Sequence, residues 1–358
     1  MAMAAEVAEL NTFEHVVDSS DFANASRFDP DFNGKIWNSD PIPWNGWWVL
    51  LLLAILGILG NALVLMVLLR PRHKRSSTDT LIANLALADL MTCLAVTPLP
   101  IAHAVKTVPE SSAGYIFCTF VHIPFFLLLS TVASILTLMT ISIERFVAVV
   151  HPYTFDRAFT PRKTLTIIGS IWAFSIVINI YHFLIITAKD GECIVKFPSE
   201  TVQVVLGIAI FFCRYCFPTT VMVVCHILTI RELLRRNKHI VRSSWCRSSR
   251  RTRLVRVRRR VVATLFAIIV VFIVCWTPDQ LFYLFSNLGV IDRSYIFEET
   301  HRNLLLLGFI TSISNIIIYA AMNPKFRQAV RNMFQGFGEA CHHGLCYQIY
   351  EHVTRKGA

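Results

Sequence analysis

The sequence is poor in charge: only 16% of its 358 residues are Asp, Glu, Lys or Arg, and 54% are hydrophobic. Soluble proteins contain about 25% charged and 45–50% apolar residues, so this chain cannot cover itself with a polar surface. Glycine and proline number only 14 each and cysteine only 10. These counts exclude a collagen-like chain, a disordered chain and a disulfide scaffold. The composition that remains is that of an integral membrane protein.

Seven apolar stretches are each long enough for a membrane-spanning helix, which needs about 20 residues. They are residues 47–69, 80–105, 116–150, 164–187, 202–230, 261–286 and 303–322. These runs are continuous, whereas barrel strands alternate apolar and polar residues over about ten positions. The sequence therefore predicts an all-α membrane protein, a bundle of seven transmembrane helices over residues 46–322.

The formal net charge of +11 is concentrated in one connecting segment. Residues 231–260 carry thirteen Lys or Arg against Glu232, whereas residues 1–45 carry eight acidic residues against two basic ones. Basic and neutral-to-acidic segments alternate along the chain, and cytoplasmic loops carry an excess of Lys and Arg. We therefore expect a multi-pass plasma-membrane protein with an extracellular acidic tail at 1–45 and a third cytoplasmic loop at about 231–260.

The first ten residues lack the cationic start and apolar core of a signal peptide, so we expect the first span to act as the insertion signal. The tail contains one N-glycosylation sequence, Asn24-Ala25-Ser26. Because this tail is expected outside the cell, Asn24 is a candidate glycosylation site.

Three charged residues lie inside the predicted spans: Asp89, Arg214 and Asp279. A charge at bilayer depth costs at least about 2.5–3.5 kcal/mol on insertion scales, so such residues face the bundle interior and usually carry function. Arg214 and Asp279 could instead lie near a helix end and extend toward the surface. Asp89, at mid-span, is the strongest candidate for a functional role.

Short motifs stand in order, about one on each apolar stretch. They are Gly60-Asn61, the run from Asn84 to Asp89, Glu144-Arg145-Phe146, Trp172, Pro218, Cys275-Trp276-Thr277-Pro278, the run from Asn315 to Tyr319, and Asn323-Pro324-Lys325-Phe326-Arg327. In this combination the chain resembles the rhodopsin-like (class A) G-protein-coupled receptors, over residues 45–335. The resemblance implies a receptor that activates a heterotrimeric G protein. It also implies no enzyme activity, and the signatures of hydrolases and nucleotide-binding enzymes are absent.

The resemblance assigns activation and G-protein coupling to seven residues of the third, sixth and seventh spans. They are Glu144, Arg145, Phe146, Trp276, Pro278, Asn315 and Tyr319. Proline inside a helix removes a hydrogen bond and kinks it, so we expect a hinge at Pro278 that lets the cytoplasmic half of the sixth helix swing outward. By resemblance, Arg145 pairs with Glu144 at rest and contacts the G protein when released.

Four short polar residues lie at mid-span on four different helices: Asn61, Asp89, Ser134 and Asn315. By resemblance they converge on an interior network, where family members often hold a sodium ion. Oxygen ligands suit this hard cation, and a network with water alone is the alternative. No other metal or cofactor is expected.

Only Cys118 and Cys193 fall in segments expected outside, which permits one disulfide and matches the bridge usual in the family. Cys341 and Cys346 lie in the expected cytoplasmic tail at 336–358, beyond an amphipathic eighth helix expected at 323–335. These two cysteines are candidate palmitoylation sites, with free thiols as the alternative.

Four features depart from the family's pattern. Ile316 stands where the seventh helix usually has Pro, and His226 stands where the fifth helix usually has Tyr. The fourth helix has only His182 near its outer end, where Pro is usual. Cys118 and Arg145 are 27 positions apart, more than is usual, which predicts an extra partial turn or bulge in the third helix.

The ligand class follows from exclusion. Residues 303–322 contain no Lys, which retinal requires, and Phe125 or Leu127 stands where amine receptors have Asp. No second external cysteine pair suggests a chemokine receptor. A neuropeptide receptor remains, and the acidic tail would attract a basic peptide. The alternatives are a receptor of the same fold for a lipid or small molecule and, far less favoured, a membrane transporter.

Arg214 and Asp279 are expected to border the ligand cavity, where they bind opposite charges on the peptide or each other. Gln280, Tyr283, Phe125 and Phe126 are the other expected ligand-binding residues. Inside the cell, the basic run at 242–260 is tethered between two spans, so membrane lipids and the G protein are its expected partners instead of nucleic acid. Arrestin is a further expected partner.

Overall fold

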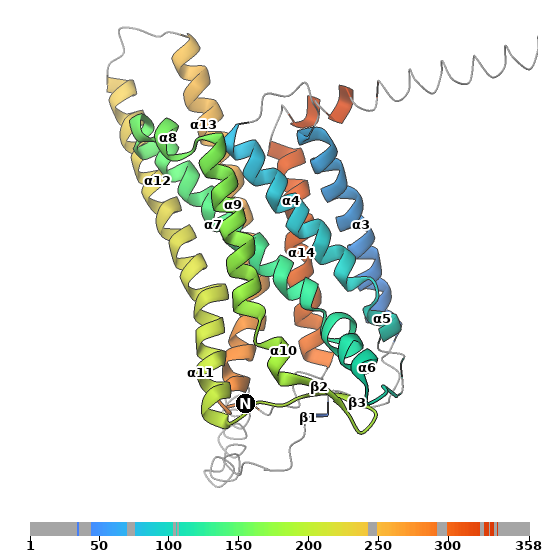
Figure 1. Ribbon diagram of the computed structural model, residues 1–358. Helices are drawn as coiled ribbons and strands as arrows, with labels where there is room; N and C mark the ends of the chain where they lie inside the picture. The colour runs from blue at the N-terminus through green and yellow to red at the C-terminus, as the bar shows by residue number, and fades with distance from the viewer. Residues whose placement is uncertain are drawn as a thin grey trace, which may run out of the picture.

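The computed structural model describes residues 34–35, 44–69, 76–102, 105, 107–242, 249–291, 299–322, 326–328, 330–332 and 335. Its helices form seven columns that lie side by side (Figure 1). In chain order the columns are α3 (Trp44–Leu68), α4 (Ser77–Val96), α6 (Ser112–Phe117) with η1 (Cys118–His122) and α7 (Phe125–Val150), α9 (Pro161–Asn179) with α10 (His182–Ile185), α11 (Glu200–Phe211) with η2 (Phe212–Cys216) and α12 (Phe217–Arg242), α13 (Ser249–Asn287), and α14 (Glu299–Met322).

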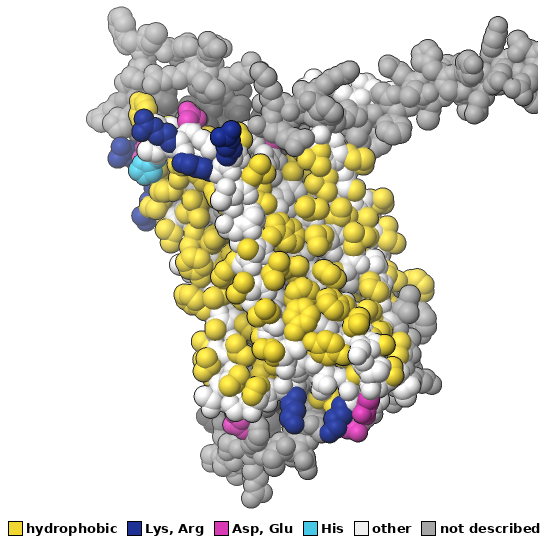
Figure 2. All heavy atoms as spheres, viewed as in Figure 1, with side chains coloured by type: hydrophobic (Ala, Val, Ile, Leu, Met, Phe, Trp, Pro, Cys, Tyr) yellow, Lys and Arg dark blue, Asp and Glu magenta, His cyan; other side chains and the backbone are white. Residues whose placement is uncertain are grey.

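Six described helical segments are long and apolar enough to cross a membrane. They are Gly46–Leu68, Ser77–Val96, Ser112–Val150, Pro161–Ile185, Glu200–Arg236 and Phe266–Asn287. The seventh column, α14, has 24 residues and contains the apolar segment Asn303–Ile316. Figure 2 shows hydrophobic side chains over the middle of the visible face and charged ones near its two ends. Lipid is the solvent that suits such a surface, and the predicted seven-helix membrane bundle is confirmed.

A small antiparallel sheet covers one end of the bundle, at the bottom of Figure 1, which we call the hairpin end. Strands β2 (Ile186–Lys189) and β3 (Glu192–Val195) form a hairpin, and β1 (Gly34–Lys35) adds to the other edge of β3. Asp190 and Gly191 both have positive φ, as a tight two-residue hairpin turn requires. The sequence analysis did not predict this sheet.

The third column contains the expected bulge. It is the π-helical turn η1, which starts at Cys118 and is followed by an interruption before α7 begins at Phe125. Pro124 occupies the cap position of α7, where its missing N–H removes no helical hydrogen bond. The predicted bulge is confirmed, but the sequence analysis did not recognise Pro124 as the residue that separates the two parts.

Two other prolines differ in their position relative to the helices. Pro98 lies between α4 and the short α5 (Leu99–Ala102), whereas Pro278 lies inside the continuous α13. α14 runs through Ile316 without interruption, as expected where the usual proline is missing. The π-helical turn η2 in the fifth column was not predicted.

The segment expected as a third cytoplasmic loop, 231–260, is largely helical. α12 continues to Arg242 and α13 begins at Ser249, so much of this expected loop consists of the ends of two helices. Arg, Lys and Leu are good helix formers, and both helices therefore continue past the apolar stretches. A further short helix, α8 (Pro152–Ala158), lies at the same end of the bundle, at the top of Figure 1.

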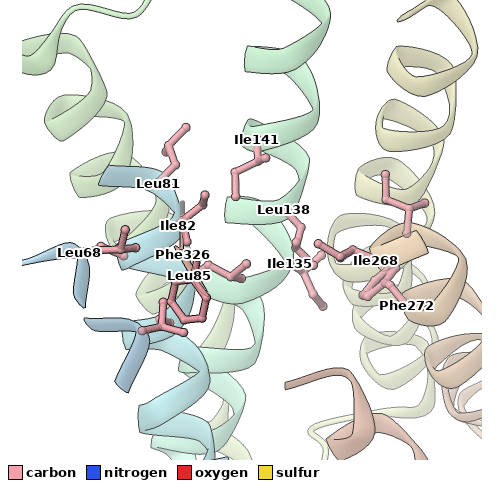
Figure 3. Packing of buried hydrophobic residues seen from close by; sticks show 14 of the residues in the cluster. Leu68, Leu81, Ile82, Leu85, Ile135, Leu138, Ile141, Ile268, Phe272 and Phe326 are labelled. Atoms are coloured by element: carbon pink, nitrogen blue, oxygen red, sulfur yellow. The ribbon is translucent and has the colours of Figure 1, made fainter. Parts of the chain in front are cut away.

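The main hydrophobic core joins α3, α4, α7, α12 and α13 (Figure 3). Leu81, Leu85, Ile141 and Phe272 are almost fully buried in it, and Phe326 from beyond α14 also packs there. Residues 326–328 and 330–332 are helical, but their neighbours lie outside the described residues, so the eighth helix at 323–335 stays a prediction. Asn24, Cys341, Cys346 and the side chain of Tyr319 also lie outside the description.

Candidate functional site

Asp89 lies at the centre of a buried polar network. Its side chain is on α4, and the residue is only 2% exposed. Ser134 of α7 donates a hydrogen bond of 2.8 Å to Oδ1, and Asn315 of α14 donates one of 2.9 Å to Oδ2. Ser312 donates a third, of 3.3 Å, to Oδ1. Three donors from two other helices thus surround a carboxylate that would otherwise be costly to bury.

Asn61 connects α3 to the same network. Its Nδ2 donates hydrogen bonds to the backbone oxygens of Gly57, at 3.0 Å, and Ser312, at 3.3 Å. The structure therefore brings together the four polar residues singled out in the sequence, and it adds Ser312. That serine was missed, although it stands three positions before Asn315 and so on the same face of the helix.

A cavity of about 10 Å³ adjoins the network, with room for about one water molecule. Asn61, Asp89 and Asn315 supply its polar lining, and Ile316 is among its apolar neighbours. The oxygens of Asp89 and Ser134 are of the kind that a small hard cation prefers. The residues present therefore fit a sodium ion.

Asn84 links three helices close to this network. Trp172 of α9 donates its indole N–H to Asn84 Oδ1 over 2.9 Å, and Asn84 Nδ2 donates to Thr137 Oγ1 over 2.8 Å. Asn84 is 5% exposed and Thr137 is fully buried. Both amide atoms of Asn84 are thus satisfied inside the bundle, which fixes α4 against α7 and α9.

Glu144 and Arg145 form an ion pair at the end of the bundle opposite the hairpin. Arg145 Nε lies 2.5 Å from Glu144 Oε2, and the Glu144 side chain is fully buried. Ser77 and Thr78, at the start of α4, donate hydrogen bonds of 3.0 and 2.8 Å to Glu144 Oε1, and Arg145 also contacts Thr78. Phe146, the third residue of the motif, stacks edge-on against His151. This motif therefore holds α7 against the start of α4.

The expected hinge in α13 touches both neighbouring columns. Trp276 donates its indole N–H to Thr311 Oγ1 of α14 over 3.2 Å, and Tyr215 of η2 shares a hydrogen bond with Thr277. Thr277 also donates to the backbone oxygen of Ile273 over 2.5 Å, one turn earlier, where Pro278 weakens the helix. Both neighbouring columns therefore contact α13 immediately before Pro278.

Aromatic residues gather at the hairpin end. Phe125 and Phe126 pack with Phe120 and Phe183, with ring centroids 4.8 to 6.0 Å apart. Phe125 is buried and Phe126 is 46% exposed. The expected disulfide is present: it joins Cys118 of η1 to Cys193 of β3, and fixes the hairpin to the third column.

The charged residues expected to bind ligand have separate surroundings. Arg214, on η2, donates a hydrogen bond to Asn179 Oδ1 at the end of α9. Asp279 is buried and accepts a hydrogen bond of 2.9 Å from Gln280. Among the ion pairs of the described residues there is none between Arg214 and Asp279, so of the two alternatives left open by the sequence the structure does not show the mutual pair.

Tyr283, the last of the expected ligand residues, lies near Arg214 and Tyr181. Asn179 and Tyr181 were not selected from the sequence. Asn179 could have been selected from the sequence because it is a polar residue near the end of an otherwise apolar stretch.

A family model described as "7 transmembrane receptor (rhodopsin family)" matches residues 60–324. The chain belongs to this family. The resemblance drawn from the motifs is thereby confirmed, and the transporter alternative is excluded. Since the family consists of receptors, this rhodopsin-family receptor is not an enzyme.

Two groups of individual receptors are similar to this rhodopsin-family receptor along most of its length. Galanin receptor type 1 of Homo sapiens is 28% identical over 295 residues, which are 79% of this chain and 80% of that receptor. Neuromedin-U receptor 2 of Rattus norvegicus is 29% identical over 309 residues, which are 81% of this chain and 75% of that receptor. The similarity covers about four fifths of the chain and is not limited to the short motifs.

Proposed function

We propose that the protein is a cell-surface receptor for a basic neuropeptide and that it activates a heterotrimeric G protein. The observation that carries this proposal is the family match, together with similarity to two kinds of neuropeptide receptor over about four fifths of the chain. A receptor of the same fold for a lipid or small molecule remains the second candidate.

The charge distribution supports the orientation and the basic ligand. The hairpin end carries the disulfide, which forms in oxidising compartments, and the acidic segment 1–45 precedes the bundle. Opposite charge raises the rate at which a ligand meets its site. In this proposal the hairpin end faces outside, the acidic tail attracts the peptide, and Asp279 binds one of its basic groups.

Activation proceeds in this proposal as a shift between two arrangements of the bundle. Peptide binding favours the arrangement in which α13 bends at Pro278 and its cytoplasmic half moves outward. Arg145 then leaves Glu144 and contacts the G protein. Arrestin and acidic membrane lipids are further partners at this end, where residues 231–260 carry a net charge of +12.

Sodium opposes this shift in the proposed mechanism. When bound, the ion supplies a positive charge beside Asp89, and the residues Ser134, Ser312 and Asn315 keep that carboxylate in place. Such a site stabilises the inactive arrangement because the ion binds that arrangement better.

The decisive experiment screens a peptide library on cells that express the receptor and report both calcium and cyclic AMP. We expect a response to one or more basic peptides. A response to a lipid or an amine, with none to any peptide, would overturn the assigned ligand class. The variant Arg145→Ala should retain peptide binding but lose signalling, while Arg157→Ala, at an exposed position on α8, should leave both intact.

A further inference from the structure

We propose that Arg214 is a subsite for a carboxylate of the peptide ligand, and that its occupation is transmitted to the hinge in α13 through the neighbouring Tyr215. This inference rests on the proposed peptide-receptor function. It assigns a specific anionic group to a ligand whose overall character is basic.

The backbone presents Arg214 in an unusual way. It is the middle residue of the π-helical turn η2, Phe212–Cys216, between α11 and α12. Single π-helical turns inside α-helices occur often at functional sites, because the extra residue redirects the side chains around it. Here Arg214 is directed toward α9 and the adjacent Tyr215 toward α13.

One end of the guanidinium is held in a fixed position. Arg214 donates from Nη2 to Asn179 Oδ1, and Asn179 is fully buried. The amide of Asn179 is itself fixed, because its Nδ2 donates a hydrogen bond of 2.7 Å to the backbone oxygen of Ser175. A guanidinium oriented in advance loses less entropy when it binds a second group.

The positive charge of Arg214 has no counter-ion in the part of the chain that the structure describes. The ion pairs found there join Glu144 to Arg145, and Glu232 to Arg235 and Arg236. Asn179 supplies an oxygen but no net charge. In addition, Nε of Arg214 is buried and has no hydrogen-bond partner among the described residues. A charged donor left in this state is unfavourable.

A carboxylate is the group that best supplies both a counter-ion for Arg214 and a hydrogen-bond acceptor for its Nε. It neutralises the charge, and its two oxygens match the planar fork of guanidinium donors. Arg214 as a whole is partly exposed although its Nε is buried, so we infer that its side chain shifts when a ligand carboxylate binds to Nε. Tyr181 and Tyr283 lie in the same neighbourhood.

The position of Tyr215 explains how binding could promote activation. Its hydroxyl is hydrogen-bonded to Thr277, and its ring lies 6.3 Å from that of Phe272, centroid to centroid. Thr277 directly precedes Pro278. A shift of the π-helical turn when Arg214 binds a carboxylate would therefore move a side chain that contacts the hinge.

The test uses the peptides that activate the receptor in the library screen. Each peptide is made with a free C-terminal acid and with a C-terminal amide. Further versions replace each Asp by Asn and each Glu by Gln. On the unaltered receptor, removal of one carboxylate should lower affinity by about tenfold or more, as loss of a charged hydrogen-bond partner does. The form that loses affinity shows whether the terminal or a side-chain carboxylate binds. Equal affinity for all forms would overturn the inference and leave the peptide-receptor function standing.

Receptor variants locate the effect. Arg214→Gln should lower affinity for the carboxylate-bearing peptide but not for its neutral analogue, which is the pattern of direct coupling in a double-mutant cycle. Equal losses for both peptides would show that Arg214 only connects α9 to the fifth column, and would contradict the inference. Lys189→Gln, at an exposed position in β2, is the matched control and should leave both affinities unchanged. If Arg214→Gln does not reach the surface, the comparison of peptides on the unaltered receptor still tests whether the receptor binds a carboxylate, and equal affinities there overturn the inference.

The proposed transmission of binding from Arg214 through Tyr215 to α13 is tested by the maximal signalling response. Tyr215→Phe removes only the hydroxyl that contacts Thr277, so we expect unchanged peptide affinity and a reduced maximal response. A full response would overturn the proposed role of Tyr215 in transmission.

Discussion

At the scale of single residues, the surroundings of Asp89 decide what this carboxylate can do. It accepts three hydrogen bonds and adjoins a cavity large enough for one small ion or water. An asparagine would keep the size of the side chain but remove the charge that attracts a cation.

We expect sodium to weaken agonist binding to the receptor and Asp89→Asn to abolish this effect, because in the proposed mechanism an ion beside Asp89 would stabilise the inactive arrangement. Replacing sodium with N-methylglucamine at equal ionic strength should raise agonist affinity roughly tenfold, within the usual range of allosteric coupling. Competition binding measures the change. Asp156→Asn, at an exposed position, should remain as sensitive to sodium as the original receptor.

The hydrogen bond between Trp172 and Asn84 allows a test of stability. Trp172→Phe removes the indole donor and leaves Asn84 Oδ1 without this partner, so we expect a loss of about 1 kcal/mol. Thermal unfolding of the detergent-solubilised receptor should show it as a lower midpoint. Phe174→Leu, at an exposed position on the same helix, is the control. Equal midpoints for Trp172→Phe and the original receptor would contradict the assigned bond.

At the scale of helices, the close approach of α3 and α14 depends on a glycine. A Cβ atom on Gly60 would lie 2.3 Å from Ile316 Cδ1, well inside van der Waals contact. Ile316 stands where the family usually has proline, and its side chain occupies the space beside Gly60. This packing holds the unbroken seventh helix against the first.

Gly60→Ala should therefore destabilise the receptor by about 1–3 kcal/mol, the usual effect of overpacking. Adding Ile316→Ala should recover much of the loss, because the smaller side chain leaves room for the new methyl group. Thermal unfolding of the two single variants and the double variant measures this coupling. Gly169→Ala is the matched control, since its Cβ would have no neighbour within 4 Å. A double variant that shows only the sum of the two single effects would contradict direct packing.

At the scale of the whole molecule, the sequence concentrates acidic residues in segment 1–45 and basic residues in segment 231–260. The positive-inside rule predicts that these two segments lie on opposite sides of the membrane. Asn24 gives a direct measure of this orientation because glycans are added only on the outer side.

We expect an N-glycosidase to increase the electrophoretic mobility of the receptor from animal cells, and Asn24→Gln to abolish this shift. An antibody against an epitope added before residue 1 should also label cells that have not been permeabilised. Labelling only after permeabilisation would reverse the proposed orientation. An epitope added after Ala358 serves as the control and should require permeabilisation.

Much of the candidate site was predictable from the sequence because single residues stood out against an apolar background. Asp89 and Asn315 were identified in this way, and the long spacing from Cys118 to Arg145 predicted the bulge in the third column. Ser312 and Asn179 were missed because small or amide side chains are common in membrane helices, and only their contacts distinguish them. The full length of α12 was not visible in the sequence because the apolar stretch ends before the helix does.

The sequence by itself determined the membrane class, the seven spans and the family. It could do so because a lipid-facing helix must be apolar over about 20 residues, a requirement visible without knowledge of any contact. Only the tertiary structure decided which groups meet. It brought Arg214 to Asn179 and not to Asp279, and it brought Tyr215 to Thr277, next to Pro278. Such pairings join residues far apart in the chain, and the packing of the helices selects them.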